Sequence, residues 1–273
     1  MIASPTDLKA LARDMRVDVI RMIEAAGNGH PGGSLSIIDL LAVLYWKFLK
    51  HDPNNPDWQQ RDRLILSKGH ACPALYTVMA YRGYFPKERL RTLRKLGSPL
   101  QGHPDRLRLP GIEFSSGSLG QGLSVGLGMA IAAKMDQAPW KTYVVLGDGE
   151  LQEGQCWEAF MAAPKFKLDN LIAIVDHNNG QIDGPVEQVM GIEPLEGKLR
   201  SFNWDVQSVP GHDLAAIEKA LAKAQACAGK PHAIIAKTIK GKGVSFMENN
   251  IAWHGNAPKK EDADKAVREI LHG

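Results

Sequence analysis

Residues 147–154 read Gly-Asp-Gly-Glu-Leu-Gln-Glu-Gly, and residues 175–180 read Val-Asp-His-Asn-Asn-Gly. An apolar, β-branched run at 142–146 precedes the first stretch, and a second such run at 171–175 leads into the other. Short apolar runs of this kind are typical of strands buried in a parallel sheet. Between them, residues 155–163 are predicted to form a helix that ends at the following proline. Ligands of open parallel sheets bind at the carboxyl ends of such strands.

The side chains at these two strand ends suit a divalent cation. Mg²⁺ takes hard oxygen ligands in an octahedron and often shares them between a few protein groups and a phosphate. Asp148 offers a carboxylate oxygen, Asn178 an amide oxygen and Gly180 a backbone carbonyl. Gly149 has no Cβ, so a phosphate can approach its backbone closely, and the helix that follows directs free N–H groups at the anion. The residues predict a site for Mg²⁺, with Ca²⁺ or Mn²⁺ as alternatives, and a diphosphate.

The composition indicates a globular protein with one large α/β domain. The chain has 273 residues, of which 44% are hydrophobic and 23% charged, and its net charge is +3. Such a small charge gives no case for nucleic acid or membrane, but it is compatible with phosphorylated substrates. The three cysteines are far apart, which predicts reduced thiols and a cytoplasmic location. We expect no signal peptide and no membrane span.

Helices and strands are predicted to alternate along the rest of the chain. Further strands are expected at 63–67, 205–209 and 233–238. Helices are predicted from apolar spacing and capping residues: after the N-cap Ser4 to the C-cap Gly27, over 37–49 with Ser36 and Asp39 at its start, from Gly122, from a His212-Asp213 cap, and from Lys260. The helix after Gly122 is rich in glycine and alanine, which predicts close packing against another helix. This order predicts an α/β fold, a doubly wound parallel sheet with helices on both faces.

Four histidines stand beside glycines, either at predicted strand ends or in loops before helices: His30, His70, His103 and His254. A single histidine in such a place is more often structural or exposed than functional. Four of them at one sheet edge, however, would line a pocket for a polyol. Neutral histidines donate and accept hydrogen bonds and move protons near neutral pH. His212 is left out of this set because its position suits a helix cap, and His177 is expected to point away from the site.

Residues 117–122 and Glu153 each have a simpler explanation than a functional site of their own. The glycines of residues 117–122 are spaced in the reverse order of the dinucleotide fingerprint, which argues against a nicotinamide site. Glu153 is equally consistent with two roles. It could be an acid at the start of a helix, where it interacts favourably with the helix dipole, or it could be a functional residue.

Together the motifs resemble those of the N-terminal, thiamine diphosphate-binding domain of the transketolase family over essentially the whole chain. They occur in family order: Gly29 to Gly32, Ser67 to His70, Gly102 to Pro104, Gly117 to Gly122, Gly147 to Gly154, and His254-Gly255. The resemblance implies a thiamine diphosphate-binding fold of the diphosphate-binding (PP) type, as a single domain over residues 1–273. Ser118 and Asp105 depart mildly from the family pattern.

The resemblance also implies roles for single residues. The metal ligands would be Asp148, Asn178 and the carbonyl of Gly180. The cofactor contacts would be His70, Gly117, Leu119, Gly149, Glu150, Asn178 and His254. The ketose contacts and proton carriers would be His30, His70, His103 and His254. Glu153 resembles an acid near the interface between chains that is linked to the cofactor-activating carboxylate of the facing chain.

Full-length members of this family continue into a pyrimidine-binding and a C-terminal domain, which are expected to be absent here. The resemblance therefore implies one subunit of a split transketolase, active only with a partner chain in an α₂β₂ assembly. It would transfer a two-carbon ketol unit from a ketose, by default phosphorylated, to an aldose. Two alternatives remain open: a subunit of a dihydroxyacetone synthase or deoxyxylulose phosphate synthase, and a non-catalytic diphosphate-binding module.

Overall fold

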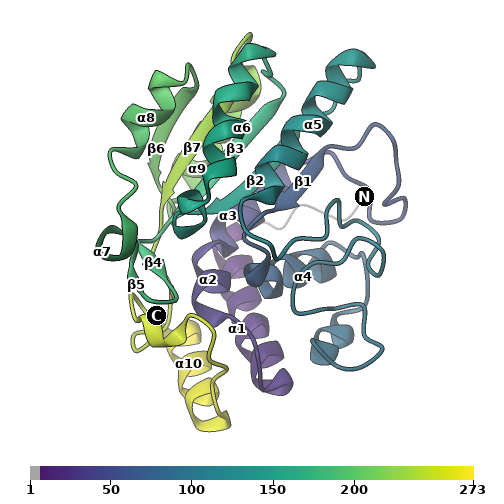
Figure 1. The fold of residues 1–273 in the computed structure, drawn as a ribbon. Helices are drawn as coiled ribbons and strands as arrows, with labels where there is room; N and C mark the ends of the chain where they lie inside the picture. The colour runs from purple at the N-terminus through teal and green to yellow at the C-terminus, as the bar shows by residue number, and fades with distance from the viewer. Residues whose placement is uncertain (1–6) are drawn as a thin grey trace.

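The computed structural model describes residues 7–273, whose central feature is a parallel sheet (Figure 1). In this part of the chain the sheet has five strands, which lie side by side in the order β1 (Arg63–Leu66), β2 (Thr142–Gly147), β3 (Leu171–His177), β7 (His232–Lys237) and β6 (Asp205–Pro210). All neighbouring pairs are parallel. The carboxyl ends of the strands therefore meet at one edge, as the sequence predicted.

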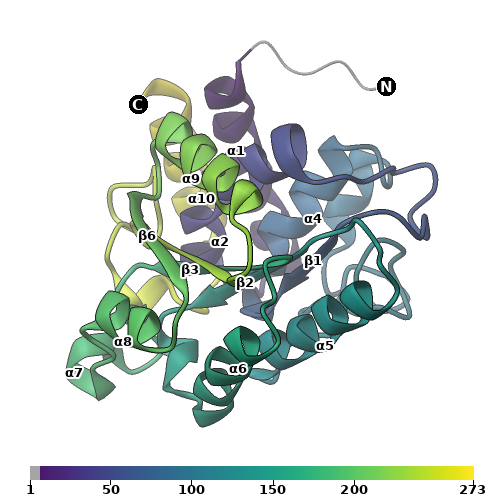
Figure 2. The ribbon, with the colours of Figure 1, turned by 90° about the horizontal axis from the view of Figure 1, so that it is seen from above.

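Helices cover both faces of the sheet (Figure 2). One face carries α1 (Leu8–Ala26), α2 (Pro31–Ser36), α3 (Ile38–Val43), α4 (Cys72–Tyr81) and α9 (Leu214–Ala226), with α10 (Lys260–His272) against α1. The other face carries α5 (Gln121–Met135), α6 (Gly154–Lys165) and α8 (Leu195–Ser201). Val145 and Ile174 belong to the first core, whereas Val144 and Val175 belong to the second. Burial on both faces explains why the strands are continuous apolar runs.

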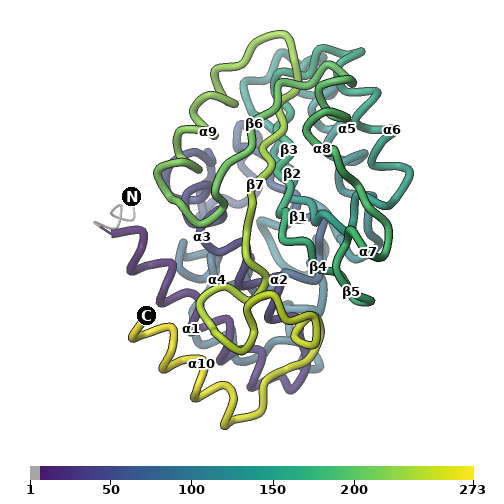
Figure 3. The backbone as a smooth tube through the Cα atoms, turned by 90° about the vertical axis from the view of Figure 1, so that its left-hand side faces the viewer, coloured from purple at the N-terminus to yellow at the C-terminus, as the bar shows by residue number. Residues whose placement is uncertain are grey.

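Short elements connect these layers. They are the π-helical turn Leu44–Phe48, the 3₁₀ turns Gly69–Ala71, Lys87–Thr92, Gly149–Gln152 and Ile251–Trp253, the hairpin strands β4 (Gly180–Gln181) and β5 (Gly184–Pro185), and α7 (Val186–Met190). The chain leaving β7 passes beside α2 before it reaches α10 (Figure 3), and the N–H of Gly241 donates to the carbonyl of Gly32 at 3.0 Å. Among residues 7–273, no helix combines the length and the apolar character that crossing a bilayer requires.

The small residues of α5 allow it to lie close to the sheet. A Cβ at Gly126 would stand 2.5 Å from Cγ2 of Val144, and a Cβ at Gly122 would stand 2.4 Å from Oγ of Ser67. The sequence predicted close packing, but against another helix. The contacts at these two positions are made by a strand residue and by the residue that follows β1.

The first helix begins later than the sequence predicted. The side chain of Asp7 caps α1 by accepting hydrogen bonds from two backbone N–H groups of the first turn, at 2.8 and 3.2 Å. The predicted cap, Ser4, lies outside the described residues. Gly27 ends the helix in the left-handed region with φ 64°, as predicted.

The second helical segment differs more from its prediction. Helical residues begin at Pro31 rather than after Ser36, and the segment breaks at Ile37 before it continues. Ser36 does not cap a helix, because its hydroxyl donates to the carbonyl of Gly33 and to Asp176 Oδ2, at 3.0 and 2.6 Å. A partner on β3 therefore decides the role of this serine, which local sequence does not show.

Two helix ends also differ from their predictions. Pro164 lies inside the last turn of α6 instead of ending the helix. The carbonyl of Phe160, which has no helical donor at position 164, accepts from the indole N–H of Trp204 at 2.7 Å. The N-cap of α9 is Asp213 alone, whose carboxylate accepts from two backbone N–H groups at 2.9 and 3.1 Å. His212 points elsewhere and has no part in that cap.

Candidate active site

A cleft of about 240 Å³ opens where β1, β2 and β3 end. The residues that line it come from eight segments: His30, Lys68, His70, His103, Gly117, Leu119, Gly147 to Glu150, Asn178, Gly180 to Asp183, Lys240 and His254. Every residue that the sequence singled out for metal, cofactor or sugar lies there, except Glu153. Larger cavities of about 620 and 710 Å³ lie elsewhere, without this convergence of predicted residues.

Asp148 and Asn178 meet at the ends of β2 and β3, as predicted. The carboxylate of Asp148 is buried and accepts from the N–H groups of Gly149, at 2.8 Å, and Asn179. Burial, together with the charge of Asp176, raises the pKa of Asp148. No ion pair joins Asp148 to a cationic side chain among residues 7–273. An unpaired buried carboxylate of this kind fits a metal ion, whose charge would reverse the shift.

Asn178 and Gly180 supply the other two oxygen donors. The side-chain N–H of Asn178 donates to Asp176 Oδ2 at 3.0 Å, which leaves its oxygen on the side of Gly180, whose N–H it accepts at 3.0 Å. The carbonyl of Gly180 accepts from Nζ of Lys240 at 3.1 Å. Three hard oxygens therefore border one space, which is the donor set that Mg²⁺ prefers.

A buried ion pair that the sequence did not predict supports this cradle. Lys68 and Asp176 are in direct contact, with side chains 2% and 1% exposed. Burial opposes ionisation of Asp176, but Lys68 and hydrogen bonds from Ser36 and Thr238 lower its pKa below the usual value. These contacts of Asp176 connect β3 to α2 and to the loop after β1. Asp176 lies in residues 175–180, beside Asn178, and nothing in the neighbouring sequence distinguishes it from a metal ligand.

Lys240 is the second functional candidate that sequence reasoning missed. Its side chain is 2% exposed and lines the cleft. Burial, and then the nearby charge of Lys68, lower the pKa of Lys240 to about 8. Two lysines in a cleft that also holds glycine N–H groups are suited to an anion. The only signal in the sequence was the position of Lys240, three residues beyond a strand end.

Glu150 lies in the cleft, but its carboxylate is engaged within the chain. Oε1 accepts from the N–H of Gly120 at 2.9 Å and from the hydroxyl of Ser67, and Oε2 accepts from the N–H of Gly147 at 3.0 Å. It therefore holds the Gly117–Gly120 loop against two strand ends. Glu153 lies outside the cleft, at the start of α6, where its side chain caps no N–H group.

The four predicted histidines form one cluster. The ring of His30 lies 5.4 Å from that of His70, 6.3 Å from that of His103 and 5.5 Å from that of His254. Burial is the main reason why all four pKa values are lowered, to about 4 for His30 and about 3 for His254. All four rings are therefore neutral at pH 7. Nδ1 of His30 and of His254 is buried and has no partner among the described residues, so both rings keep a polar atom free.

We expect these histidines to make the folded chain sensitive to acid. Because the folded-state pKa of His30 is about 4 against 6.5 for the free side chain, the unfolded chain binds more protons between these values. Stability is therefore unaffected above pH 6.5 and falls as the pH drops from 6.5 towards 4. The thermal unfolding midpoint, followed by circular dichroism, should show this slope, and His30→Gln should reduce it. His272→Gln, at an exposed position, is the control and should leave the slope unchanged. A His30→Gln slope equal to wild type would contradict the assignment.

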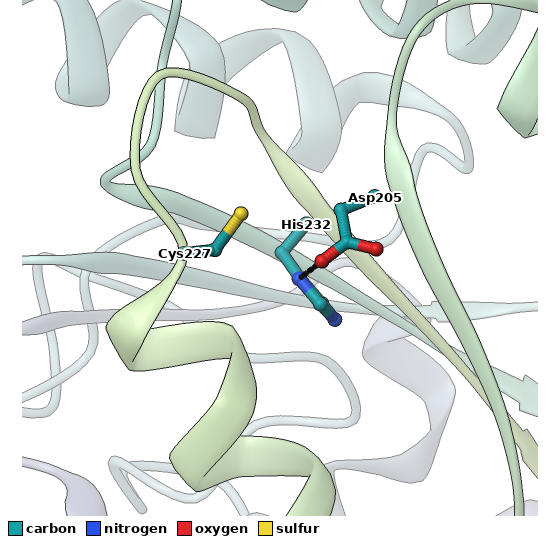
Figure 4. A group of neighbouring side chains, drawn as sticks. All are labelled: Asp205, Cys227 and His232. Carbon is teal, nitrogen blue, oxygen red and sulfur yellow. Dashed lines mark ion pairs between the residues drawn. The ribbon is translucent and has the colours of Figure 1, made fainter.

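Figure 4 shows a second cluster, Asp205, Cys227 and His232, whose ligand atoms lie within 4.8 Å of one another. It stands at the starts of β6 and β7, at the sheet edge opposite the cleft. The side-chain N–H₂ of Gln207 donates to the carbonyl of Ala220 at 3.0 Å and lies 2.8 Å from Nε2 of His232, which must accept. The proton of this ring is then on Nδ1, 3.2 Å from Asp205 Oδ2. A metal ion at Nδ1 needs the other tautomer, so we assign this cluster no metal.

The chain is similar to known proteins in both sequence and fold. Residues 8–272 match the family described as transketolase, thiamine diphosphate binding domain. The chain is 48% identical over 264 residues to the 6-deoxy-6-sulfo-D-fructose transketolase subunit SqwG of Clostridium sp. (strain MSTE9), covering 97% of this chain and 96% of that protein. It is 44% identical over 255 residues to an apulose-4-phosphate transketolase subunit of Phocaeicola vulgatus, covering 93% of this chain and 90% of that protein.

Longer relatives match over part of their length. Human transketolase is 40% identical over 269 residues, which are 96% of this chain but 42% of that protein. The crystal structure of transketolase from Campylobacter jejuni superposes with a TM-score of 0.91 at 38% identity, covering 97% of this chain and 42% of that one. The fold and the resemblance predicted from the sequence are thereby confirmed: the chain belongs to the transketolase family, of which it forms the thiamine diphosphate-binding domain.

Proposed function

We propose that this chain is the diphosphate-binding subunit of a split transketolase. It would transfer a two-carbon ketol unit from a ketose to an aldose, with thiamine diphosphate and a divalent metal, and only together with a second chain. The observation that carries the proposal is the convergence of the oxygen cradle and four neutral histidines in one cleft. A module that only binds diphosphate would have no use for His30 and His103, which the proposal assigns to the ketose.

The residues of the cradle suit the charged end of the cofactor. Asp148, Asn178 and the Gly180 carbonyl would hold Mg²⁺, or Ca²⁺ or Mn²⁺ in its place. His70, His254 and the N–H of Gly149 would contact the diphosphate, and the cationic Lys240 would balance its charge. Gly117 and Leu119 would border the aminopyrimidine. Glu150 would act through the loop that it anchors rather than by direct contact.

When bound, thiamine diphosphate supplies an electron sink for cleavage of a carbon–carbon bond. The protein then has to orient the sugar and move protons at its hydroxyl groups. The ring of His30 lies near all three other rings, whereas His70 and His254 would also contact the diphosphate. We therefore assign the hydrogen bonds to the ketose chiefly to His30 and His103. Because the rings are neutral at pH 7, each can donate at one nitrogen and accept at the other. Glu153 would face the partner chain.

The partner chain would carry the pyrimidine-binding and C-terminal domains, so that this chain contributes a single domain. The names of its relatives as subunits support this, and an α₂β₂ assembly follows the preference for two-fold symmetry. A cytoplasmic location is part of the proposal and agrees with three free cysteines in the described residues. The donor would be a ketose with an anionic group at its far end, because one relative is named for a sulfonated sugar and another for a phosphorylated one.

The test is an assay of the chain with and without its partner. The purified chain should give no ketol transfer, and a pyrimidine-domain chain encoded beside it should restore transfer from xylulose 5-phosphate, 6-deoxy-6-sulfofructose or apulose 4-phosphate. Release of aldehyde product would be followed with each donor, and with pyruvate as the control for a synthase. Full activity of the chain alone would overturn the split-subunit proposal. Turnover of pyruvate in place of these ketoses would favour a deoxyxylulose phosphate synthase.

A further inference from the structure

Residues 238–241, which follow β7, place Lys240 in the lining of the cleft, and each of the four is held by a hydrogen bond. The Thr238 hydroxyl donates to Asp176 Oδ1, and Nζ of Lys240 donates to the carbonyl of Gly180 at 3.1 Å. The N–H of Gly241 donates to the carbonyl of Gly32 at 3.0 Å. Of these three contacts, the one between Lys240 and Gly180 lies in the cleft.

Ile239 is held by a residue that lies outside the cleft. Its backbone N–H donates to Nε2 of His212 at 2.8 Å. His212 does not line the cleft; it lines a separate cavity of about 710 Å³. Because Nε2 accepts this hydrogen bond, the ring proton is on Nδ1, which donates to Asp39 Oδ2 at 2.7 Å.

Asp39 is itself fixed. Its carboxylate accepts from both terminal nitrogens of Arg16, in the fork geometry that gives a strong charge-assisted contact. Burial opposes its charge, but His212 and Arg16 together lower the pKa of Asp39 below its usual value, so it stays ionised. Arg16, Asp39 and His212 thus form a chain of contacts from α1, through α3, to the backbone N–H of Ile239.

Gly211, next to His212, packs closely against the segment that follows β7. The N–H of Gly211 donates to the carbonyl of Lys237 at 2.7 Å, and a Cβ at Gly211 would stand 2.3 Å from Cγ2 of Thr238. Any side chain at position 211 would therefore displace the segment. Gly211 thus packs against the end of β7, and His212, for which the sequence predicted a role in a His212-Asp213 helix cap, instead bonds to Ile239 and Asp39.

We infer that His212 is a positioning residue for cofactor binding. By holding the N–H of Ile239 it fixes the backbone from which Lys240 reaches Gly180 and the diphosphate space, without touching the ligand. The inference rests on the proposed function, which places a diphosphate there. Residues that orient metal ligands from outside are worth about 10- to 100-fold in metal affinity, and we expect an effect of this size for the diphosphate.

Two substitutions separate the two hydrogen bonds of His212. In His212→Gln, Oε1 occupies the place of Nε2 and still accepts from Ile239, while the bond to Asp39 is lost. In His212→Asn the shorter side chain still reaches Asp39, while the bond to Ile239 is lost. His51→Gln is the control, because the ring of His51 likewise bridges a backbone group, here the carbonyl of Tyr45, and a side chain, that of Tyr84, but lies before β1 and away from the cleft. Thermal unfolding of all three variants would show any general loss of stability.

The readout is the Kd of thiamine diphosphate for the assembled enzyme at saturating Mg²⁺, measured by calorimetry, together with kcat at saturating cofactor. We expect His212→Asn to weaken binding about 10- to 100-fold, with kcat near wild type, and His212→Gln and His51→Gln to bind like wild type. An unchanged Kd in His212→Asn, or equal losses in both His212 variants, would overturn the positioning role while the wild-type enzyme still binds. Failure of the wild-type assembly to bind thiamine diphosphate would overturn the proposed function and this inference together.

Discussion

Replacing Asp148 by alanine should abolish Mg²⁺-dependent retention of thiamine diphosphate by the assembled enzyme. Asp148 borders the cleft beside Asn178 and Gly180 and forms no ion pair among the described residues. Two acids nearby cannot take its place: Glu150 is held by the N–H groups of Gly120 and Gly147, and Asp176 already accepts from Lys68, Ser36 and Thr238. Loss of a direct ligand should exceed the effect of a supporting contact, so we expect affinity for the cofactor to fall by more than about 100-fold.

Retention would be measured as bound thiamine diphosphate after gel filtration in Mg²⁺ and after EDTA treatment. Asp205→Asn is the matched control, since it alters a carboxylate at the opposite edge of the sheet and should retain cofactor like wild type. Circular dichroism should show that Asp148→Ala is folded. If Asp148→Ala kept its cofactor in an Mg²⁺-dependent manner, the metal assignment would be wrong.

The largest expected effect on stability is that of Lys68→Met. Methionine is similar in length to lysine but has no charge, so Asp176 would stay buried without its cation. Removing one partner of a buried ion pair costs about 3–5 kcal/mol, whereas an exposed pair contributes about 0–1 kcal/mol. The Lys68 and Asp176 side chains are almost fully buried, which places this pair in the first class. The free energy of unfolding in urea should fall accordingly.

Two further variants test the reason for this effect. Lys68→Met combined with Asp176→Asn removes both charges and should recover part of the lost stability, because no unpaired charge remains buried. Lys47→Met breaks the pair with Glu218, whose side chains are 38% and 44% exposed, and should change stability by about 1 kcal/mol at most. A loss in Lys68→Met no larger than that in Lys47→Met would show that this pair does not stabilise the fold.

The sequence alone was sufficient for the parts of the site that local order determines. A parallel strand ends where its apolar run ends, and neighbouring carboxyl ends meet at one edge, so Asp148 and Asn178 had to lie close together. The same reasoning brought His70 to that edge. The motifs in family order placed His30, His103 and His254 beside it, and the structure shows all four rings in one cluster.

The tertiary structure decided which polar groups pair with one another. Ser36 and Lys68 reach Asp176 across 140 and 108 residues of sequence, and Asp39 reaches His212 across 173. Local sequence favoured capping roles for Ser36 and His212 because capping depends only on near neighbours. A buried polar group, by contrast, must find its partner wherever the packed layers bring one. The sequence therefore determined where the strands end, and packing determined which charges and hydrogen bonds hold those ends in place.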